Sequence, residues 1–268
     1  NYNTLSDNNC SSNFAYGISL YSSSGNVLSD NNCSSNIHVG INLNSANDNT
    51  LKDNDCSSGD HSGITLYQSS GNIVRDNNCL NREIGMYLFS SSDNTLSGNN
   101  CSSDSTYGII LQGASSNTLF DNHCSDNYLG IYLFQSSNSN NISWNQIHNN
   151  SEQGVYIQAG SNNRLWSNTF MSNNGGGVQA YDDGTNNWWN STDGYGNYWS
   201  DWTTPDVSPA DGIVDVPYDI AGSAGAKDHY PLTAAPPVPI PEFSSMLLVV
   251  IILTTVIIII RMRPRNTL

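Results

Sequence analysis

A repeat of about 23 residues runs through most of the chain and limits the folds that it can adopt. Glycine followed by an apolar residue recurs eight times, from Gly17-Ile18 to Gly177-Val178, and cysteine recurs at intervals of 23, 23, 23, 22 and 23 residues. Units of this length cannot bury an apolar face alone, so they stack on their neighbours as a solenoid. The cysteines are Cys10, Cys33, Cys56, Cys79, Cys101 and Cys124.

Within each unit, apolar and polar residues alternate, which predicts β-strands rather than helices. In the first unit, Leu5, Cys10, Ile18 and Leu20 are expected to point inward. Short runs between Asn, Ser and Gly predict three brief strands per unit. We therefore expect an all-β, right-handed, single-stranded parallel β-helix over residues 1–190, with eight to nine coils of about 22–24 residues stacked about 4.8 Å apart.

Two asparagine series follow the same period, and fixed spacing of this kind is not explained by Asn-rich low complexity. Asn tolerates the left-handed conformation that a sharp corner requires, and its amide can pair with the same Asn one coil away. We expect two ladders at two corners. The first series runs through positions 3, 26, 49, 72, 94, 117, 140, 163 and 186. The second is Asn8, Asn31, Asn54, Asn77, Asn99, Asn122, Asn145 and Asn168.

The cysteines are interpreted as buried free thiols that act as small apolar side chains. Ile147 and Phe170 continue the same series, so the position accepts any apolar residue. Stacked cysteines have parallel side chains about 4.8 Å apart, beyond the usual reach of a disulfide. Disulfides between neighbouring coils remain the alternative. A zinc or thioredoxin-like site is not expected because no CxxC motif occurs.

After Gly177 the repeat gives way to an aromatic, Asp-rich stretch. Residues 191–232 are expected to cap the open end of the solenoid core, with Trp188 in register with Leu165 closing the last coil. The alternative is that the tryptophans form a platform for glycans. The aromatic residues are Trp188, Trp189, Tyr195, Tyr198, Trp199 and Trp202.

The C-terminal region predicts attachment to a membrane. Residues 233–243 are Pro-rich and form a stiff linker, and residues 244–268 contain an uncharged apolar run followed by Arg261, Arg263 and Arg265. The run is at the short limit for a membrane span, with the arginines inside and the β-helix outside. Because the sequence does not start with Met, we interpret it as a mature or truncated product and infer an export signal upstream.

The charge balance excludes one class of partner. The formal net charge is −15 with only 8 Lys and Arg residues, so there is no basic stripe for nucleic acid. Cations and neutral glycans are more plausible partners. The Asp residues could equally serve only to keep a repetitive protein soluble.

An aromatic track on the strands that follow each Gly-apolar pair is the candidate glycan-binding site, because aromatic rings stack on sugar faces. The alternative is that aromatic residues simply favour strands. The candidates are Tyr67, Tyr87, Phe89, Tyr132, Phe134, Tyr156 and Tyr181, with Tyr21 at the start of the track. Six sequons suit a glycosylated protein, although several can occur by chance in such an Asn-rich chain: Asn9, Asn32, Asn100, Asn141, Asn149 and Asn190.

Three further groups of residues contain side chains suited to metal binding or catalysis. His38, His61 and Glu83 share one position in three consecutive coils, with Asp60 beside them, and imidazole suits copper, nickel or zinc. The alternative is a variable polar turn. A weaker calcium site is predicted at Asp206, Asp211, Asp215 and Asp219. The adjacent pair Asp182-Asp183 lies at the end of the repeat, and no catalytic residue is assigned.

The sequence also resembles two known kinds of protein segment. Pro241-Glu242-Phe243, followed by an apolar run and an Arg cluster, resembles the PEF-type C-terminal sorting signal of archaeal surface proteins. This implies cleavage by an archaeosortase and transfer to a lipid on the extracellular face of the cell membrane.

Residues 1 to about 232 resemble the NosD-like β-helix proteins of the periplasmic copper-binding or carbohydrate-binding type. The resemblance rests on the N-x-x-x-x-N-x-C and G-I-x-L repeat and on the segments 196–201, 211–218 and 228–232. It implies a surface protein that binds envelope glycans or is structural. The alternatives are copper handling, with copper or calcium as possible cofactors, and a polysaccharide lyase or glycoside hydrolase, whose fold alone implies no activity.

Overall fold

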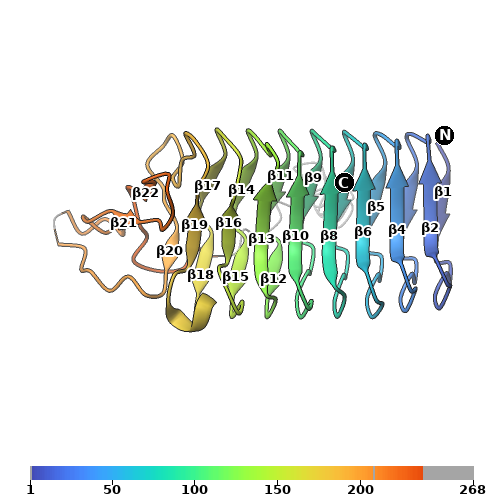
Figure 1. The fold of residues 1–268 in the computed structure, drawn as a ribbon, viewed down its shortest axis with the longest axis horizontal. Coiled ribbons are helices and arrows are strands. Elements are labelled where there is room, and N and C mark those ends of the chain that lie inside the picture. The colour runs from blue at the N-terminus through green and yellow to red at the C-terminus, as the bar shows by residue number, and fades with distance from the viewer. Residues whose placement is uncertain (1, 208, 238–268) are drawn as a thin grey trace, which may run out of the picture. The chain divides into compact units, whose positions relative to one another are not determined.

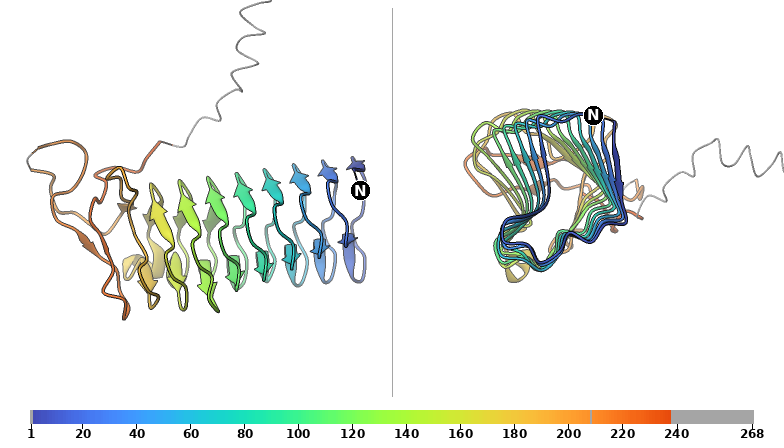
Figure 2. Two further views of the ribbon diagram at one scale, coloured as in Figure 1. Left: turned by 90° about the horizontal axis from the view of Figure 1, so that it is seen from above. Right: turned by 90° about the vertical axis from the view of Figure 1, so that its right-hand side faces the viewer.

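The structure, a computed structural model, describes residues 2–207 and 209–237. This part is an all-β, right-handed parallel solenoid of about eight turns, which confirms the predicted fold class. Successive coils stack from the N-terminus (blue) towards the cap (orange), and they nearly superimpose when viewed along the solenoid axis (Figure 1, Figure 2). Register is strict, since Ile41 pairs with Ile18 on one side and with Ile64 on the other.

Three parallel sheets form the walls, and we call them sheets 1, 2 and 3. Sheet 1 consists of β1 (Thr4–Ser6), β3 (Val27–Ser29), β5 (Thr50–Lys52), β7 (Ile73–Arg75), β9 (Thr95–Ser97), β11 (Thr118–Phe120), β14 (Asn141–Ser143) and β17 (Arg164–Trp166). Sheet 2 consists of β2 (Tyr16–Tyr21), β4 (Val39–Asn44), β6 (Ser62–Tyr67), β8 (Ile84–Phe89), β10 (Tyr107–Gln112), β13 (Leu129–Phe134), β16 (Val155–Ile157) and β19 (Ala180–Asp182).

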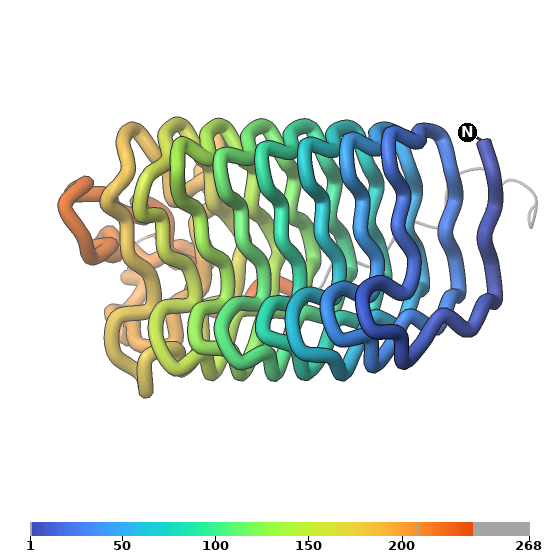
Figure 3. Tube along the Cα trace, turned by 45° about the vertical axis from the view of Figure 1, so that its right-hand side comes forward, coloured from blue at the N-terminus to red at the C-terminus, as the bar shows by residue number. Residues whose placement is uncertain are grey.

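Sheet 3 is shorter than predicted. It consists of β12 (His123–Ser125), β15 (Gln146–His148), β18 (Thr169–Met171) and β20 (Tyr198–Trp199). In the preceding coils it is reduced to single bridges, such as Asn9 to Asn32. The other elements are the 3-10 helix η1 (Asn173–Gly176) and an antiparallel pair, β21 (Tyr218–Asp219) and β22 (Lys227–Asp228). The Cα trace in Figure 3 shows the coils following one another without an inserted loop.

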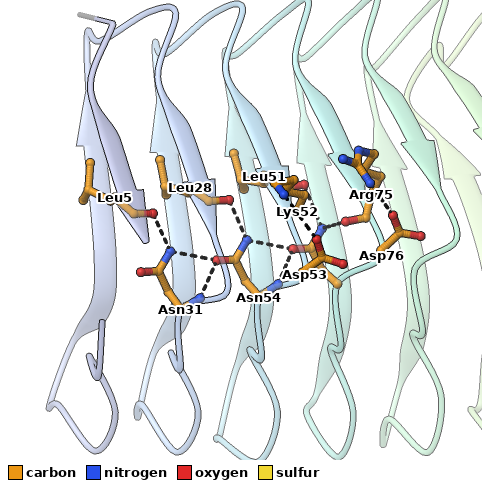
Figure 4. Close-up of polar contacts among 10 residues, drawn as sticks. Leu5, Leu28, Asn31, Leu51, Lys52, Asp53, Asn54, Arg75 and Asp76 are labelled. Carbon is orange, nitrogen blue, oxygen red and sulfur yellow. Dashed lines mark hydrogen bonds and ion pairs between the residues drawn. The ribbon is translucent and has the colours of Figure 1, made fainter. Parts of the chain in front are cut away.

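The Asn8 series forms a continuous hydrogen-bonded ladder along one corner (Figure 4). The Nδ2 of Asn54 donates to Oδ1 of Asn77 at 2.9 Å and to the carbonyl of Leu28 at 3.0 Å. Its Oδ1 accepts from the backbone N of Asn31 at 3.1 Å. Each amide therefore satisfies buried backbone groups that the turn would leave unpaired.

Two details of the predicted ladders are wrong. The left-handed residue at each corner is the one before the ladder Asn, for example Asp53 with φ 56°, so the Asn can point inward with ordinary backbone angles. The first ladder ends through a hydrogen bond of 3.1 Å from Asn163 to Asn187. Asn186 instead takes the left-handed position, with φ 54°, because the last coil contains one extra residue.

A third ladder runs along another corner and was not predicted. Asn13 donates to Asn36 at one end, and Asp104, Asn127, Asn150 and Asn173 continue the row at the other. Between them the row contains Gly59 and Arg82. The buried Arg82 donates from Nε to the carbonyl of Cys56 at 2.7 Å and from Nη1 to the carbonyl of Asn36 at 2.9 Å.

All six cysteine thiols are free, and five of them are buried while Cys10 is partly exposed. They lie in one file inside the core, followed by Ile147 and Phe170 in the same register on sheet 3. Burial raises the pKa of the Cys101 thiol to about 11.

Stacked aromatic rings close the C-terminal end of the core. Trp199 stacks between Phe170, at 4.3 Å, and Tyr218, at 4.2 Å between ring centroids. The predicted pairing of Trp188 with Leu165 is wrong by one residue, because Trp188 pairs with Arg164 and is 43% exposed. Trp189 is the fully buried residue that closes the coil, and its Nε1 donates to Asp182 at 2.9 Å.

The predicted sorting motif Pro241-Glu242-Phe243 and the membrane segment 244–268 lie outside the described residues. Among the residues that the structure does describe, none belongs to a helix with the length and apolar character of a membrane span.

Candidate functional site on sheet 2

The outer face of sheet 2 carries two parallel rows of side chains, because alternate residues of each strand point outward. In β13, Ile131 and Leu133 are fully buried, whereas Tyr132 and Phe134 are half-buried. One row contains Tyr87, Tyr132, Tyr156 and Tyr181. The other contains Tyr67, Phe89 and Phe134. All seven predicted glycan candidates therefore lie on this face, and Tyr21 starts it with 72% of its surface exposed.

The rings in these rows stack largely on one another. Tyr132 lies 4.8 Å from Phe134 and 5.4 Å from Tyr156 between ring centroids, with interplanar angles of 5° and 27°. Tyr67 and Phe89 stack at 4.9 Å. This mutual stacking occupies ring faces and leaves mainly ring edges and hydroxyl groups for a ligand.

Hydroxyl and amide groups line the same face beside the rings. The hydroxyl of Tyr87 donates to Oε1 of Gln112, whose Nε2 donates to Oε1 of Gln135 at 2.6 Å. The hydroxyl of Tyr132 donates to Oε1 of Gln158 in the same way. These groups form a line of neutral donors and acceptors parallel to the solenoid axis.

The outer face of sheet 2 is uncharged along most of its length and acidic at its C-terminal end. Burial raises the pKa of Tyr87 and Tyr132, so both hydroxyls remain proton donors. No Lys or Arg lies on any strand of sheet 2. At the C-terminal end, the backbone N and Oγ of Ser223 both donate to Asp183 at 2.8 Å and hold the pKa of its carboxyl below the ordinary value.

Sequence reasoning missed Tyr107 and the glutamines. Tyr107 precedes its glycine, outside the strand residues that follow each Gly-apolar pair, but its ring stacks on Tyr132 at 5.4 Å. Gln112 ends its strand in register with Phe89 and Phe134, and Gln158 directly follows the last residue of β16. A search for polar residues in register with the aromatic ones would have found them.

The predicted metal column is only partly assembled. His61 Nε2 lies 3.9 Å from Glu83 Oε2. The His38 ring instead contacts Phe14 edge-on at 5.9 Å, although His38 and His61 both line a shallow hollow of about 240 Å³. Asp60 lies directly before His61, and in the described part of the chain no hydrogen bond or ion pair joins it to His38, His61 or Glu83.

The predicted calcium residues mostly bind backbone groups of their own loop. Asp206 accepts from the N of Gly212 at 2.8 Å, and Asp215 accepts from the N of Val207 at 2.8 Å. Asp211 accepts from the N of Ile213 at 3.0 Å. Asp219 is paired with Lys227 at 2.5 Å. In the described ranges, no group of three or more His, Cys, Asp or Glu side chains is arranged to hold a metal ion.

Two histidines on sheet 3 do come together, although they occupy different positions in the repeat. The rings of His123 and His148 lie 4.7 Å apart at an interplanar angle of 75°. Burial lowers the pKa of both, so both imidazoles favour the neutral form.

The adjacent pair Asp182-Asp183 does not face one ligand. Asp182 is buried and accepts from Gly184, Asn187 and Trp189, so its carboxylate stabilises the cap. Asp183 is bound to Ser223 as described above.

Comparison with known proteins agrees with a parallel β-helix of this kind. A family model described as "Periplasmic copper-binding protein (NosD)" matches residues 1–100 and 81–204. Since the match extends over more than half of the sequence, the chain belongs to this family. No curated protein matches the chain.

Solved structures with the same fold include two epimerases. The Azotobacter vinelandii mannuronan C-5 epimerase AlgE6 A-module is 17% identical with a TM-score of 0.65, over 69% of this chain and 55% of that one. The periplasmic alginate epimerase AlgG is 20% identical with a TM-score of 0.54, over 59% of this chain and 38% of that one. The chain thus spans about half the length of the AlgE6 module and well under half that of AlgG. The likeness establishes the fold alone.

Proposed function

We propose that this protein is an extracytoplasmic carbohydrate-binding module that holds a glycan chain along the outer face of sheet 2. The observation that carries the proposal is the line of Tyr hydroxyls and Gln amides on this face, including the contact from Gln112 to Gln135. A polymer of similar residues fits a surface that repeats once per coil, because each unit of the ligand meets similar donors and acceptors. The fold shared with the two epimerases, which are named for mannuronan and alginate, supports a polysaccharide ligand.

A glycan array probed with the full chain in mild detergent tests this proposal, and titration calorimetry then gives affinities for the glycans that bind. Tyr132→Thr is the informative variant, because Thr65 occupies the same row and the strand accepts it. We expect an at least tenfold weaker affinity. Phe120→Ser, on sheet 1, is the matched control and leaves the affinity unchanged. Equal affinities for the wild type and Tyr132→Thr would contradict a site on sheet 2.

The family description, which names a periplasmic protein, supports a location outside the cytoplasm. Residues 244–268 act in this proposal as the anchor, and Pro241-Glu242-Phe243 as the signal for its exchange for a lipid. Mass spectrometry of the protein from its native membrane distinguishes a retained segment from a lipid-modified C-terminus ending before residue 244. A retained, unmodified C-terminus would contradict the exchange of residues 244–268 for a lipid, but it would not contradict attachment to the membrane by these residues.

Copper handling is the second candidate, and the pair His123 and His148 is the observation that favours it. Neutral imidazoles are the form that copper binds. The described residues supply two imidazoles here but no group of three donors, so they do not form a complete copper centre. Calorimetry with Cu²⁺ tests this candidate. His123→Gln is the suitable variant, because Gln146 occupies the same position in the next coil.

A further inference from the structure

A pocket of about 580 Å³ lies between the end of sheet 1 and the cap. Trp144, which follows β14, and Trp166, the last residue of β17, form its floor, and Tyr195 contributes from the cap loop. Residues 232–237 form a further wall. We call this the Trp pocket. Its size is typical of sites that take small ligands or one end of a larger one.

The floor of the Trp pocket is held by backbone hydrogen bonds. The N of Trp144 donates to the carbonyl of Trp166 at 3.4 Å, so the two indoles lie on neighbouring coils in fixed register. The cap loop is fixed as well, because the N of Tyr195 donates to Oγ of Ser191 at 3.0 Å. The wall is tied down where the N of Leu232 donates to the carbonyl of Asn197 at 2.8 Å. The pocket therefore exists before any ligand binds.

The aromatic rings of the Trp pocket differ from those of sheet 2. Within the described part of the chain, Trp144, Trp166 and Tyr195 make no ring-to-ring contact with another aromatic side chain. Each indole is half-buried, and Tyr195 is 56% exposed. Their faces are therefore not taken by other aromatic rings and can pack against the C–H groups of a ligand where they line the pocket, whereas the rings of sheet 2 largely stack on one another.

The polar groups of the Trp pocket set the charge of the ligand. Asp193 supplies an exposed carboxylate, and Ser167, Ser191 and Thr233 supply hydroxyls. Among the described residues, no Lys, Arg or His lines the pocket. A carboxylate accepts hydrogen bonds from paired sugar hydroxyls, whereas it repels an anionic sugar, as does the net charge of −15.

We propose that the Trp pocket is a second carbohydrate site, which binds the terminal residue of a neutral glycan. The sugar ring stacks on an indole of Trp144 or Trp166, and its hydroxyls donate to Asp193. This site is on a different sheet from the surface proposed above, and it does not depend on a ligand being bound there. It selects neutral glycans over polyuronates, unlike a site built for alginate.

Titration calorimetry of the full chain in mild detergent tests the proposal with three probes: cellohexaose and mannohexaose as neutral glycans and a mannuronate hexamer as the anionic one. The variants are taken from the repeat itself. Trp166→Ser reproduces Ser143 of the previous coil, and Trp144→Ser reproduces Ser167 of the next. Ser167 also has a positive φ of 54°, so Ser is accepted at position 144. Phe120→Ser, at the position of Trp166 two coils earlier, is the control.

We expect at least one neutral hexamer to bind, with an affinity lowered at least tenfold in Trp144→Ser and Trp166→Ser and unchanged in Phe120→Ser. The mannuronate hexamer binds at least tenfold more weakly than that neutral glycan. Loss of binding in Tyr132→Thr but not in the Trp variants would overturn the Trp pocket and leave the sheet 2 proposal standing. Absence of binding by both neutral hexamers, or binding of the mannuronate hexamer alone, would overturn it too.

Discussion

The guanidinium of Arg82 fills the space that a side chain at Gly59 would occupy. A Cβ at Gly59 would lie 1.8 Å from Nη1 of Arg82 and 2.2 Å from the carbonyl oxygen of Asn36. Arg82 reaches across Gly59 to bind that carbonyl, so the two residues together replace two amides of the third ladder. A glycine and an arginine one coil apart are thus a single structural unit.

This relationship predicts strong coupling between positions 59 and 82. Gly59→Asn alone displaces a buried arginine and is expected to lower the free energy of unfolding by about 3 kcal/mol or more. Arg82→Asn alone leaves the carbonyl of Asn36 without its donor and costs about 1–3 kcal/mol. The double variant removes the clash with the guanidinium but keeps the 2.2 Å contact between a Cβ at position 59 and the carbonyl oxygen of Asn36, so it is expected to recover only part of the loss. Urea denaturation of the three variants measures the coupling energy.

Gly175→Asn is the control for this cycle. Position 175 has φ +61°, which Asn tolerates, and a Cβ there meets nothing within 4 Å, so stability should change little. Losses at positions 59 and 82 that simply add in the double variant would show that the two residues act independently.

Because of Asp104, we expect the free energy of unfolding to fall as the pH rises. Burial raises the pKa of its carboxyl to about 8, and one of its oxygens has no hydrogen-bond partner. In the unfolded chain the pKa is about 3.9. The folded state therefore keeps a proton that the unfolded chain releases, so this contribution is full below about pH 4 and is lost as the pH rises through 8.

The variant Asp104→Asn separates Asp104 from a second raised carboxyl. Burial raises the pKa of Asp228 to about 6, with the same sign, so its contribution is lost between about pH 4 and 6. We expect Asp104→Asn to abolish the decline between about pH 6 and 8 and to retain the decline at lower pH. Thermal unfolding measured at each pH unit checks this, and an unchanged decline above pH 6 would assign it to another group.

The periodic part of the structure was predictable because every coil turns the same corners and buries the same apolar positions. Alternation fixed which side of β13 faces the core, so Tyr132 and Phe134 were placed on the outer face correctly. The third ladder was hidden because Gly59, Arg82 and Asp104 interrupt its Asn residues. A search by residue identity does not detect a row in which one arginine substitutes for two amides.

The Trp pocket was not predictable for a different reason. It joins Trp144 of the repeat to Tyr195 of the cap loop, whose path follows no repeat and depends on how the cap packs. The stacking of Tyr132 on Phe134 was also beyond the sequence, since register places two rings side by side but does not orient them.

The position of an Asn along its ladder predicts how much stability it contributes. Asn77 is buried and donates to Leu51, Arg75 and Asn99 while its Oδ1 accepts from both nitrogens of Asn54. Asn77→Ala leaves several buried groups unpaired and is expected to cost about 3 kcal/mol.

Asn8 is the matched control at the exposed end of the same ladder, where water can replace lost partners, so Asn8→Ala should cost under about 1 kcal/mol. Urea midpoints give both values. Equal losses would mean that burial does not set the strength of the ladder.

The thiol file predicts a sharp difference in reactivity between Cys10 and the other five cysteines. Reaction with a disulfide reagent requires an accessible thiolate. Cys10 is partly exposed, whereas Cys33, Cys56, Cys79, Cys101 and Cys124 are buried. The hydrogen bond with Cys56 and burial raise the pKa of the Cys33 thiol, and burial raises the pKa of the Cys56 thiol well above the ordinary value. Burial also raises the pKa of Cys10, so accessibility is what distinguishes this thiol from the others. We expect one thiol to react quickly in the native protein and the other five only as the solenoid opens, with all six reacting quickly in denaturant.

Counting the labels by mass spectrometry over time checks this prediction, and Cys10→Ser should remove only the fast phase of labelling. Rapid labelling of several thiols in that variant would mean that the core opens between coils under native conditions.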